Sequence, residues 1–256
     1  TGDQNSLSFE TDINDNPDPI TSLIEVTPTY TINDTQCIGT SESFNVTVNP
    51  NFQMNDPDDV ILCNGDVFEE LTFTSQNSEG VTTYTWEIDT PTISDDALIF
   101  GEDGIGADNF PSFTTLNNTS ESIIATVTIT PLFSNEGVLC SPPTETFTIT
   151  VNPEPQIGDY TETICHNETF SFTPVDGENS DVVPVGTTYT WDTPVSSPVF
   201  IVTGGSAQQD QTTISQQLFN ETSSAGTLTY TVTPTSADGC PGETFDVTIT
   251  VNPEPQ

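Results

Sequence analysis

Five cysteines have the most predictable chemistry in this sequence. Two similar stretches with a period of about 100 residues carry two cysteines each, and Cys37 lies alone near the start. In each stretch one cysteine precedes the second expected strand and the other lies in the turn before the last strand, so we expect both near the same end of the fold. We therefore predict the disulfides Cys63–Cys140 and Cys165–Cys240, and a partner for Cys37 that precedes Thr1 in a longer protein.

Zinc is the competing use of these cysteines. A structural zinc site takes four ligands, usually at close spacing, whereas each stretch offers two cysteines far apart. The single histidine, His166, is next to only one of them. Disulfides are therefore the expected chemistry. Because disulfides persist in oxidising compartments, we expect the protein to be secreted or displayed on a cell surface.

A run of acidic and amide side chains near the start offers oxygen ligands of the kind that calcium prefers. The candidate ligands are Asp12, Asn14, Asp15, Asn16 and Asp18, in a pattern that resembles the calcium-binding linker of cadherins. When the repeats are aligned, the run falls on a polar turn inside the fold and not at a junction between domains. We expect a turn, with a calcium site as the alternative, and no cofactor that the fold requires.

The charge of the chain excludes several functions. It has no lysine or arginine, 39 aspartates and glutamates, and a formal net charge of -39. Nucleic-acid binding needs basic side chains against phosphates, P-loop and Schiff-base chemistry need a lysine, and electrostatic attachment to a membrane needs a basic patch. We expect none of these functions. We also expect no direct membrane insertion, because the apolar runs are short.

Catalytic sets are equally hard to assemble. With a single histidine no Ser-His-Asp or Cys-His set can be built, and no pair of carboxylates recurs in both long repeats. We expect the protein not to be an enzyme. A carbohydrate-binding array is a better alternative, because β-sandwich modules stack sugars on exposed aromatic rings. However, Trp86 and Trp191 lie in the pattern of a third strand, where they are expected to anchor the core.

The strands that position the cysteines and tryptophans are expected to belong to repeated domains. Three segments close almost identically on Val-Asn-Pro, at residues 44–50, 147–153 and 245–253. Matching the rest of the sequence to these endings gives the domain organisation. We expect the C-terminal half of a truncated repeat at 1–50, full repeats at 51–153 and 154–253, and the start of another at 254–256.

Within a repeat, apolar and polar residues alternate, as in Leu228, Tyr230 and Val232. This period of two predicts strands separated by turns rich in Gly, Asn, Asp and Pro. Seven short strands in about 100 residues are typical of an immunoglobulin-like sandwich, so the predicted fold class is all-β. In the last repeat the strands are expected near residues 158–164, 168–174, 186–192, 198–203, 212–219, 226–234 and 243–251.

Four motifs of the last repeat resemble the PKD-like repeats of very large Bacteroidetes cell-surface proteins. They are the Ile-Cys segment at 164–170, Thr-Tyr-Thr-Trp at 188–191, Thr-Val-Thr-Pro at 231–234 and Thr-Val-Asn-Pro at 250–253. The match covers nearly the whole chain. It implies tandem PKD-like domains, export by type IX secretion, and a spacer role in an adhesin or surface filament, as in gliding motility. Other surface proteins or glycans would then bind to domains outside this sequence.

The joints between repeats contain proline and no Gly/Ser spacer. Proline restricts the backbone, so successive repeats are expected to form an extended, semi-rigid array in which each repeat contacts its neighbours in the same chain. A calcium-dependent assembly module is a further alternative to the spacer role.

Overall fold

The computed structural model describes residues 8–51, 54–77, 79–94, 96, 99–100 and 105–254. Most of the expected further repeat at 254–256, and residues 1–7, lie outside the described residues. The described part consists of strands and turns with two short 3-10 helices, so the all-β prediction is confirmed. None of the described residues belongs to a helix long and apolar enough to cross a membrane.

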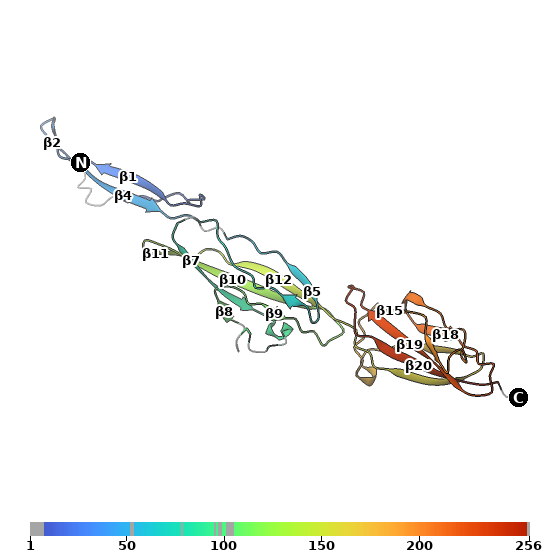
Figure 1. Cartoon of the computed structure of the whole chain (residues 1–256). Helices are drawn as coiled ribbons and strands as arrows, with labels where there is room; N and C mark the ends of the chain where they lie inside the picture. Colours follow the sequence, from blue (N-terminus) through green and yellow to red (C-terminus); the bar gives the residue numbers. More distant parts are fainter. Residues whose placement is uncertain are drawn as a thin grey trace.

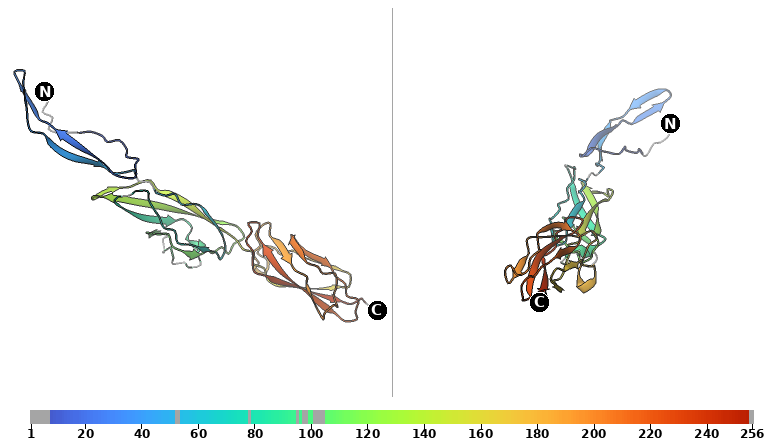
Figure 2. Two further views of the ribbon diagram at one scale, coloured as in Figure 1. Left: turned by 45° about the horizontal axis from the view of Figure 1, so that its top comes forward. Right: turned by 90° about the vertical axis from the view of Figure 1, so that its right-hand side faces the viewer.

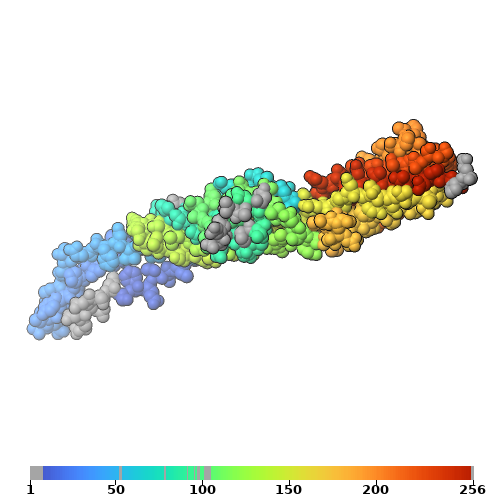
Figure 3. Space-filling model, turned by 90° about the horizontal axis from the view of Figure 1, so that it is seen from below, coloured from blue at the N-terminus to red at the C-terminus, as the bar shows by residue number. Residues whose placement is uncertain are grey.

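Three units follow one another along the long axis of the molecule, with the two chain ends at opposite ends of it (Figures 1 and 2). We call them the hairpin unit (residues 8–50), the middle repeat (51–153) and the last repeat (154–254). The space-filling view shows a narrow rod, in which the middle and last repeats are filled and the hairpin unit is thin (Figure 3). We call the end of a unit that faces the preceding part of the chain its upstream end, and the end that faces the following part its downstream end.

The hairpin unit contains two antiparallel pairs and no second layer. Its strands β1 and β4 pair from Ile20 opposite Val48 to Val26 opposite Glu42, and β2 pairs with β3 beyond them. Phe44 is 45% exposed here, whereas its equivalent in the middle repeat, Phe147, is 1% exposed. A facing sheet therefore covers this side of the fold in the other units and is missing here. The strands are β1 (Ile20–Val26), β2 (Thr29–Ile32), β3 (Thr35–Ile38) and β4 (Glu42–Val48).

The middle repeat is a two-layer sandwich. Its larger sheet has the order β5-β12-β10-β7-β8, with β11 paired to the end of β10, and its smaller sheet is β6-β9. The strand β5 runs parallel to β12, whereas the other pairs are antiparallel. The strands are β5 (Val60–Cys63), β6 (Val67–Phe68), β7 (Val81–Ile88), β8 (Ile105–Ala107), β9 (Phe113–Thr114), β10 (Ile123–Asn135), β11 (Val138–Cys140) and β12 (Glu145–Asn152), with a 3-10 helix η1 at Pro91–Ile93.

The last repeat has the same plan. Its larger sheet has the order β13-β20-β19-β15-β17, with β16 paired to β19, and its smaller sheet is β14-β18. The parallel pair is again the first strand with the last, β13 with β20. The strands are β13 (Tyr160–Cys165), β14 (Thr169–Phe172), β15 (Thr188–Trp191), β16 (Val195–Ser197), β17 (Gln208–Gln211), β18 (Ile214–Gln217), β19 (Gly226–Thr235) and β20 (Phe245–Asn252), with a 3-10 helix η2 at Glu178–Ser180.

Each repeat has its own hydrophobic core. Alternate residues of β19 and β20 point inward and are buried, while the threonines between them lie on the outer face. One core cluster draws only on residues from Met54 to Val151 and the other only on residues from Ile157 to Val251. The two sandwiches therefore share no core, and what connects them must lie at their joint.

One expected strand of the last repeat is wrong. The apolar run at 198–203 is not a strand but a turn, in which Phe200 has a φ of 66° and is 87% exposed. The neighbouring strands are instead β16, which ends at Ser197, and β17, which is built from the polar sequence Gln-Gln-Asp-Gln. Hydrophobic periodicity misses β17 because its side chains are mostly exposed.

Candidate functional site

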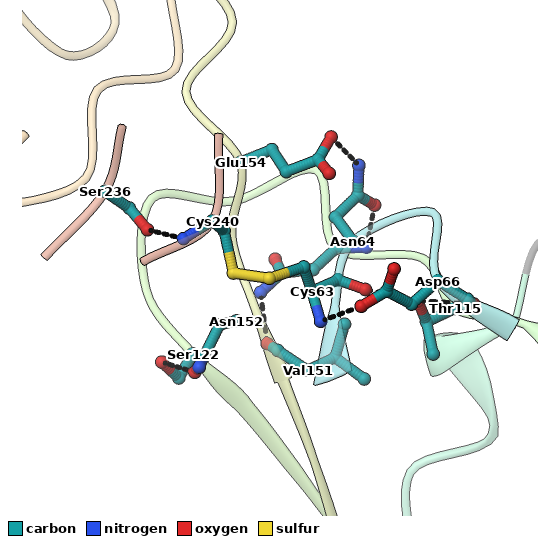
Figure 4. Close-up of a disulfide and its surroundings, with 11 residues drawn as sticks. Cys63, Asn64, Asp66, Thr115, Ser122, Val151, Asn152, Glu154, Ser236 and Cys240 are labelled. Atoms are coloured by element: carbon teal, nitrogen blue, oxygen red, sulfur yellow. Dashed lines mark hydrogen bonds between the residues drawn. A yellow bond between two sulfur atoms is a disulfide. The ribbon is translucent and has the colours of Figure 1, made fainter. Parts of the chain in front are cut away.

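The joint between the middle and last repeats carries a disulfide between Cys63 and Cys240 (Figure 4). The two Cα atoms are 5.6 Å apart, and 177 positions separate the residues in sequence. Cys63 ends β5 at the downstream end of the middle repeat. Cys240 lies in the turn between β19 and β20 at the upstream end of the last repeat. The disulfide therefore connects two repeats and not two strands of one repeat.

This pairing corrects the predicted disulfides Cys63–Cys140 and Cys165–Cys240. The two cysteines of a repeat lie at opposite ends, because β5 runs to the downstream end while β10 leads away from it. Ile123 pairs with Val151 next to Cys63, and Phe133, ten residues later, pairs with Cys140. At about 3.3 Å per residue this separates the two ends by about 33 Å. A disulfide requires Cα atoms within about 7 Å, so the pairing within a repeat is sterically excluded.

Hydrogen bonds fix the turn that presents Cys63. Its N–H donates to Asp66 Oδ2 at 2.8 Å, and its carbonyl accepts from Thr115 Oγ1 at 2.7 Å. The next residue, Asn64, donates its N–H to the carbonyl of Asn152 at 2.9 Å and accepts the N–H of Asn117 at 2.7 Å on Oδ1. The sulfur is therefore presented from a turn tied to the last strand of the same repeat.

Cys240 is held from the other side of the joint and is fully buried. Its N–H donates to Ser236 Oγ at 3.1 Å, and its carbonyl accepts the N–H of Ser236 at 2.9 Å. Two positions on, Gly242 lies so close to the linker that a Cβ there would be 1.9 Å from the carbonyl oxygen of Pro155. Only glycine permits this approach, so the linker is seated directly on the turn that carries Cys240.

The linker itself is tied to both repeats. Pro153 and Pro155 are buried, and Glu154 between them accepts a long hydrogen bond of 3.5 Å from Asn64 Nδ2 of the middle repeat. Gln156 exchanges two backbone hydrogen bonds with Val182 of the last repeat, at 2.9 and 2.8 Å. The connection therefore has little room to swing between the two sandwiches.

Side-chain hydrogen bonds reach across both joints. Ser120 Oγ of the middle repeat donates to Asp176 Oδ2 of the last repeat at 2.8 Å. At the preceding joint, Asn77 Nδ2 of the middle repeat donates to the carbonyl of Pro17 of the hairpin unit at 3.3 Å. Each joint therefore has a hydrogen bond between neighbouring units in addition to the linker.

The joint between the middle and last repeats, which we call the second joint, contains carboxylates as well as the disulfide. Burial raises the pKa of Glu154, the hydrogen bond from Asn64 opposes this rise, and repulsion from Asp66 and Glu243 adds to it. By contrast, hydrogen bonds from the Val183 N–H and from Ser120 lower the pKa of Asp176. Among the described residues no three His, Cys, Asp or Glu side chains are close enough together to hold a metal ion.

The acidic run proposed as a calcium site contains a structural asparagine. Asn14 is buried, and its Oδ1 accepts two hydrogen bonds from Asn16, at 3.1 Å from N and 3.2 Å from Nδ2. Both lone pairs of this oxygen are therefore in use. Asp12, Asp15, Asn16 and Asp18 are exposed around it. The run therefore forms a polar turn that Asn14 organises from inside.

The same asparagine recurs in every unit, which spacing alone did not reveal. Asn14, Asn117 and Asn220 are all buried, and each donates from Nδ2 to the carbonyl four residues on and to a carbonyl of the last strand. The last-strand acceptors are Val48, Val151 and Val251, at 3.0, 2.8 and 2.8 Å. In each unit this side chain pins the turn before β1, β10 or β19 to the end of the last strand, and in the middle repeat this place lies beside Cys63.

Three cysteines remain as free thiols in the described chain, Cys37, Cys140 and Cys165. Cys165 lies at the downstream end of the last repeat, with His166 in the position of Asn64. His166 Nδ1 accepts the N–H of Asn220 at 3.1 Å, just as Asn64 Oδ1 accepts the N–H of Asn117. The histidine thus takes a structural role in the turn.

The two tryptophans lie in the cores of their repeats. Trp86 is 5% exposed and contacts Phe110 with ring centroids 4.8 Å apart. Trp191 is 2% exposed, and its Nε1 donates to the carbonyl of Ser206 at 3.0 Å. Both rings are therefore core anchors, and neither is available at the surface to stack on a sugar.

Comparison with known protein families matches residues 162–255 to the PKD-like domain. Comparison with curated proteins finds no match. Similar solved structures include mouse protocadherin-24 EC1-3, at 11% identity and TM-score 0.39, covering 91% of this chain and 80% of that one. They also include human CDH23 EC21-23, at 16% identity and TM-score 0.35, covering 79% and 69% of the two chains. These low scores carry no argument about function, and the sandwich fold follows from the strand pairing described above.

Proposed function

We propose that this chain is a spacer segment of a very large extracellular adhesin or surface filament, and that its repeats hold a distal binding region away from the cell. The disulfide Cys63–Cys240 carries this proposal, because it makes the joint between two separately folded sandwiches covalent at a second point beside the linker. A protein that needed its domains to hinge would gain nothing from such a bond.

The non-covalent contacts at the joint support the same role. The linker prolines are buried, Gly242 seats the linker on the last repeat, and Ser120 bonds to Asp176 across the joint. Several contacts at one joint restrict bending more than the linker alone would. The narrow rod in Figure 3 is the shape that such joints produce.

An extracellular location fits both the disulfide and the surface chemistry. Disulfides persist where thiols are oxidised, outside the cytosol. A formal net charge of -39 with no lysine or arginine keeps neighbouring rods from associating side by side. The resemblance to Bacteroidetes repeats further suggests export by type IX secretion and a part in cell attachment or gliding. We propose no catalytic activity for these repeats.

Small-angle scattering of the whole chain tests the spacer role. We expect a rod-like particle for the oxidised protein and a more flexible particle, with a broader distribution of interatomic distances, for Cys240→Ser. Cys165→Ser removes an exposed thiol from the other end of the same repeat and should leave the scattering unchanged. A compact particle, or an oxidised chain as flexible as Cys240→Ser, would contradict the proposal.

A further inference from the structure

The free cysteines occupy the same positions as the bonded ones. We call Cys63 and Cys165 the front cysteines, because each ends the first strand of its repeat, and Cys37, Cys140 and Cys240 the rear cysteines, because each lies shortly before the last strand of its unit. The observed disulfide joins a front cysteine to the rear cysteine of the next repeat. The question is what the remaining front and rear cysteines bind.

Cys165 is presented in the same way as Cys63. It lies opposite Asn252 in the parallel pair β13–β20, as Cys63 lies opposite Asn152 in the pair β5–β12. Its N–H donates to Glu168 Oε2 at 2.7 Å, as the N–H of Cys63 donates to Asp66 Oδ2 at 2.8 Å. Cys165 is exposed at the downstream end of the rod. The thiol is therefore held in the geometry that forms the known disulfide, with no partner repeat beyond it in this structure.

Cys140 is the counterpart at the upstream end of the middle repeat. It lines a surface depression together with Val48 and Asn49 of the hairpin unit, and Asn135 Nδ2 donates to Asn49 Oδ1 at 2.9 Å. Asn49 is the equivalent of Asn152, the residue beside which Cys63 lies. Cys140 thus borders the place to which a first strand paired in parallel with β4 would bring its front cysteine.

From these equivalences we propose that every joint of the array carries the same bond, from the front cysteine of one repeat to the rear cysteine of the next. The partner of Cys165 is the rear cysteine of a repeat that follows Asn252 as the last repeat follows Asn152. The partner of Cys140 is a front cysteine on a strand beside β4. Because it stands on the geometry of the cysteines alone, this inference does not require the spacer function.

The bond forms by thiol–disulfide exchange with a small disulfide such as oxidised glutathione or with a disulfide-containing oxidoreductase. One protein thiolate attacks the disulfide and releases one small thiol, and the second protein thiolate then displaces the other. Two protein thiols give up two electrons and two protons in total, and the oxidant leaves as two thiols.

A lengthened chain provides the test. Residues 157–256 are duplicated after Gln256, so that the added copy follows in the register of the natural repeat. The added copy carries Cys165→Ser and the exposed substitution Ser223→Ala, so that its cysteine peptide differs in mass from the original one and the only Cys165 is that of the original repeat. The protein is oxidised in a glutathione buffer, its free thiols are blocked with N-ethylmaleimide without denaturation, and it is digested after glutamate, because trypsin has no site. Mass spectrometry of the non-reduced peptides then assigns each bond.

We expect two linked pairs, Cys63 with Cys240 and Cys165 with the added copy of Cys240. Cys165 should change from fully maleimide-labelled in the original chain to unlabelled in the lengthened one. In a control with Cys240→Ser only in the added copy, the label on Cys165 should return, while the bond between Cys63 and the original Cys240 stays.

Two results would overturn the proposal: a labelled Cys165 in the lengthened chain, or Cys165 linked to Cys240 of its own repeat. Calorimetry of the same sample shows whether the added repeat is folded, by a second contribution to the unfolding heat of the last repeat. A folded added repeat with a free Cys165 would establish that the disulfide at the second joint is peculiar to that joint.

Discussion

The side-chain amide of Asn220 donates a hydrogen bond of 2.8 Å to the main-chain carbonyl of Val251 in the last strand. The same group donates to the carbonyl of Ser224, and its oxygen accepts from the N–H and the hydroxyl of Thr222. Asn220 is fully buried. The turn at the downstream end of the last repeat is therefore organised by one side chain whose hydrogen-bonding capacity is fully used.

Replacing this side chain should destabilise the last repeat. Asn220→Ala leaves the buried carbonyl of Val251 and the N–H of Thr222 without partners, at a cost of about 2 to 4 kcal/mol. For a domain of this size that is a fall in Tm of about 10 to 20 °C, measurable by calorimetry. Glu221→Ala removes an exposed neighbour in the same turn and should leave Tm nearly unchanged. Equal effects of the two substitutions would contradict this role.

The strands and the tryptophan positions follow from sequence because burial of alternate residues leaves a direct pattern, as in β19. The disulfide pairing does not follow from the spacing of the cysteines, which is compatible with bonds within or between repeats. What decides it is strand direction: β5 is parallel to β12, while β10 is antiparallel, so Cys63 and Cys140 end at opposite ends. The burial of Asn220 does not follow from the sequence either, because nothing in a run of polar residues marks one of them as buried.

Glu154 should make the joint sensitive to pH. Its pKa in the folded chain is raised, chiefly by burial, so its contribution to stability is complete below the pKa of the unfolded chain and decreases as the pH rises through the folded value. Glu154→Gln cannot ionise, so the substitution removes this loss of stability at high pH. We expect a Tm higher than that of the original chain at neutral pH and equal to it at a pH well below 4.5, the ordinary value.

Calorimetry at the two pH values checks this, with Glu221→Gln as the control for a change of net charge at an exposed site. Should both variants raise Tm equally at neutral pH, the effect would belong to the overall charge and not to the joint.

Calcium should not be needed for the turn that contains Asn14. The equivalent turns at Asn117 and Asn220 form with Thr119 and Thr222 as hydrogen-bond donors in place of Asn16. Hydrogen exchange of residues 12–18 in calcium and in excess EGTA should give the same rates. Protection that appears only with calcium would restore the metal site as the better interpretation, and Asn14→Ala would then abolish it.

The disulfide should limit how far the rod extends under force. With Cys63–Cys240 closed, the covalent path from Asn51 to Pro253 has twelve residue steps before the bond and thirteen after it, or about 85 Å when fully stretched. Two folded repeats already span about 80 Å, judged from the length of β10. Unfolding of the repeats can therefore add almost no length while the bond is intact.

Single-molecule stretching of the whole chain from its two ends measures this limit. In the oxidised protein we expect no release of the residues between Cys63 and Cys240. After addition of a reductant, the 177 positions that the bond bypasses should add about 600 Å of contour length. Release of that length by the oxidised protein would show that the bond does not bear the load.

The same bond makes the backbone redundant along the segment that it bridges. A protease that cuts once anywhere between Asn64 and Gly239 leaves the two fragments joined through sulfur. The pieces around the cut also remain within their folded sandwiches. Severing this part of the rod therefore requires two events of different chemistry, a peptide cleavage and a reduction, where a chain with bonds only inside each repeat would part at a single cut in the linker.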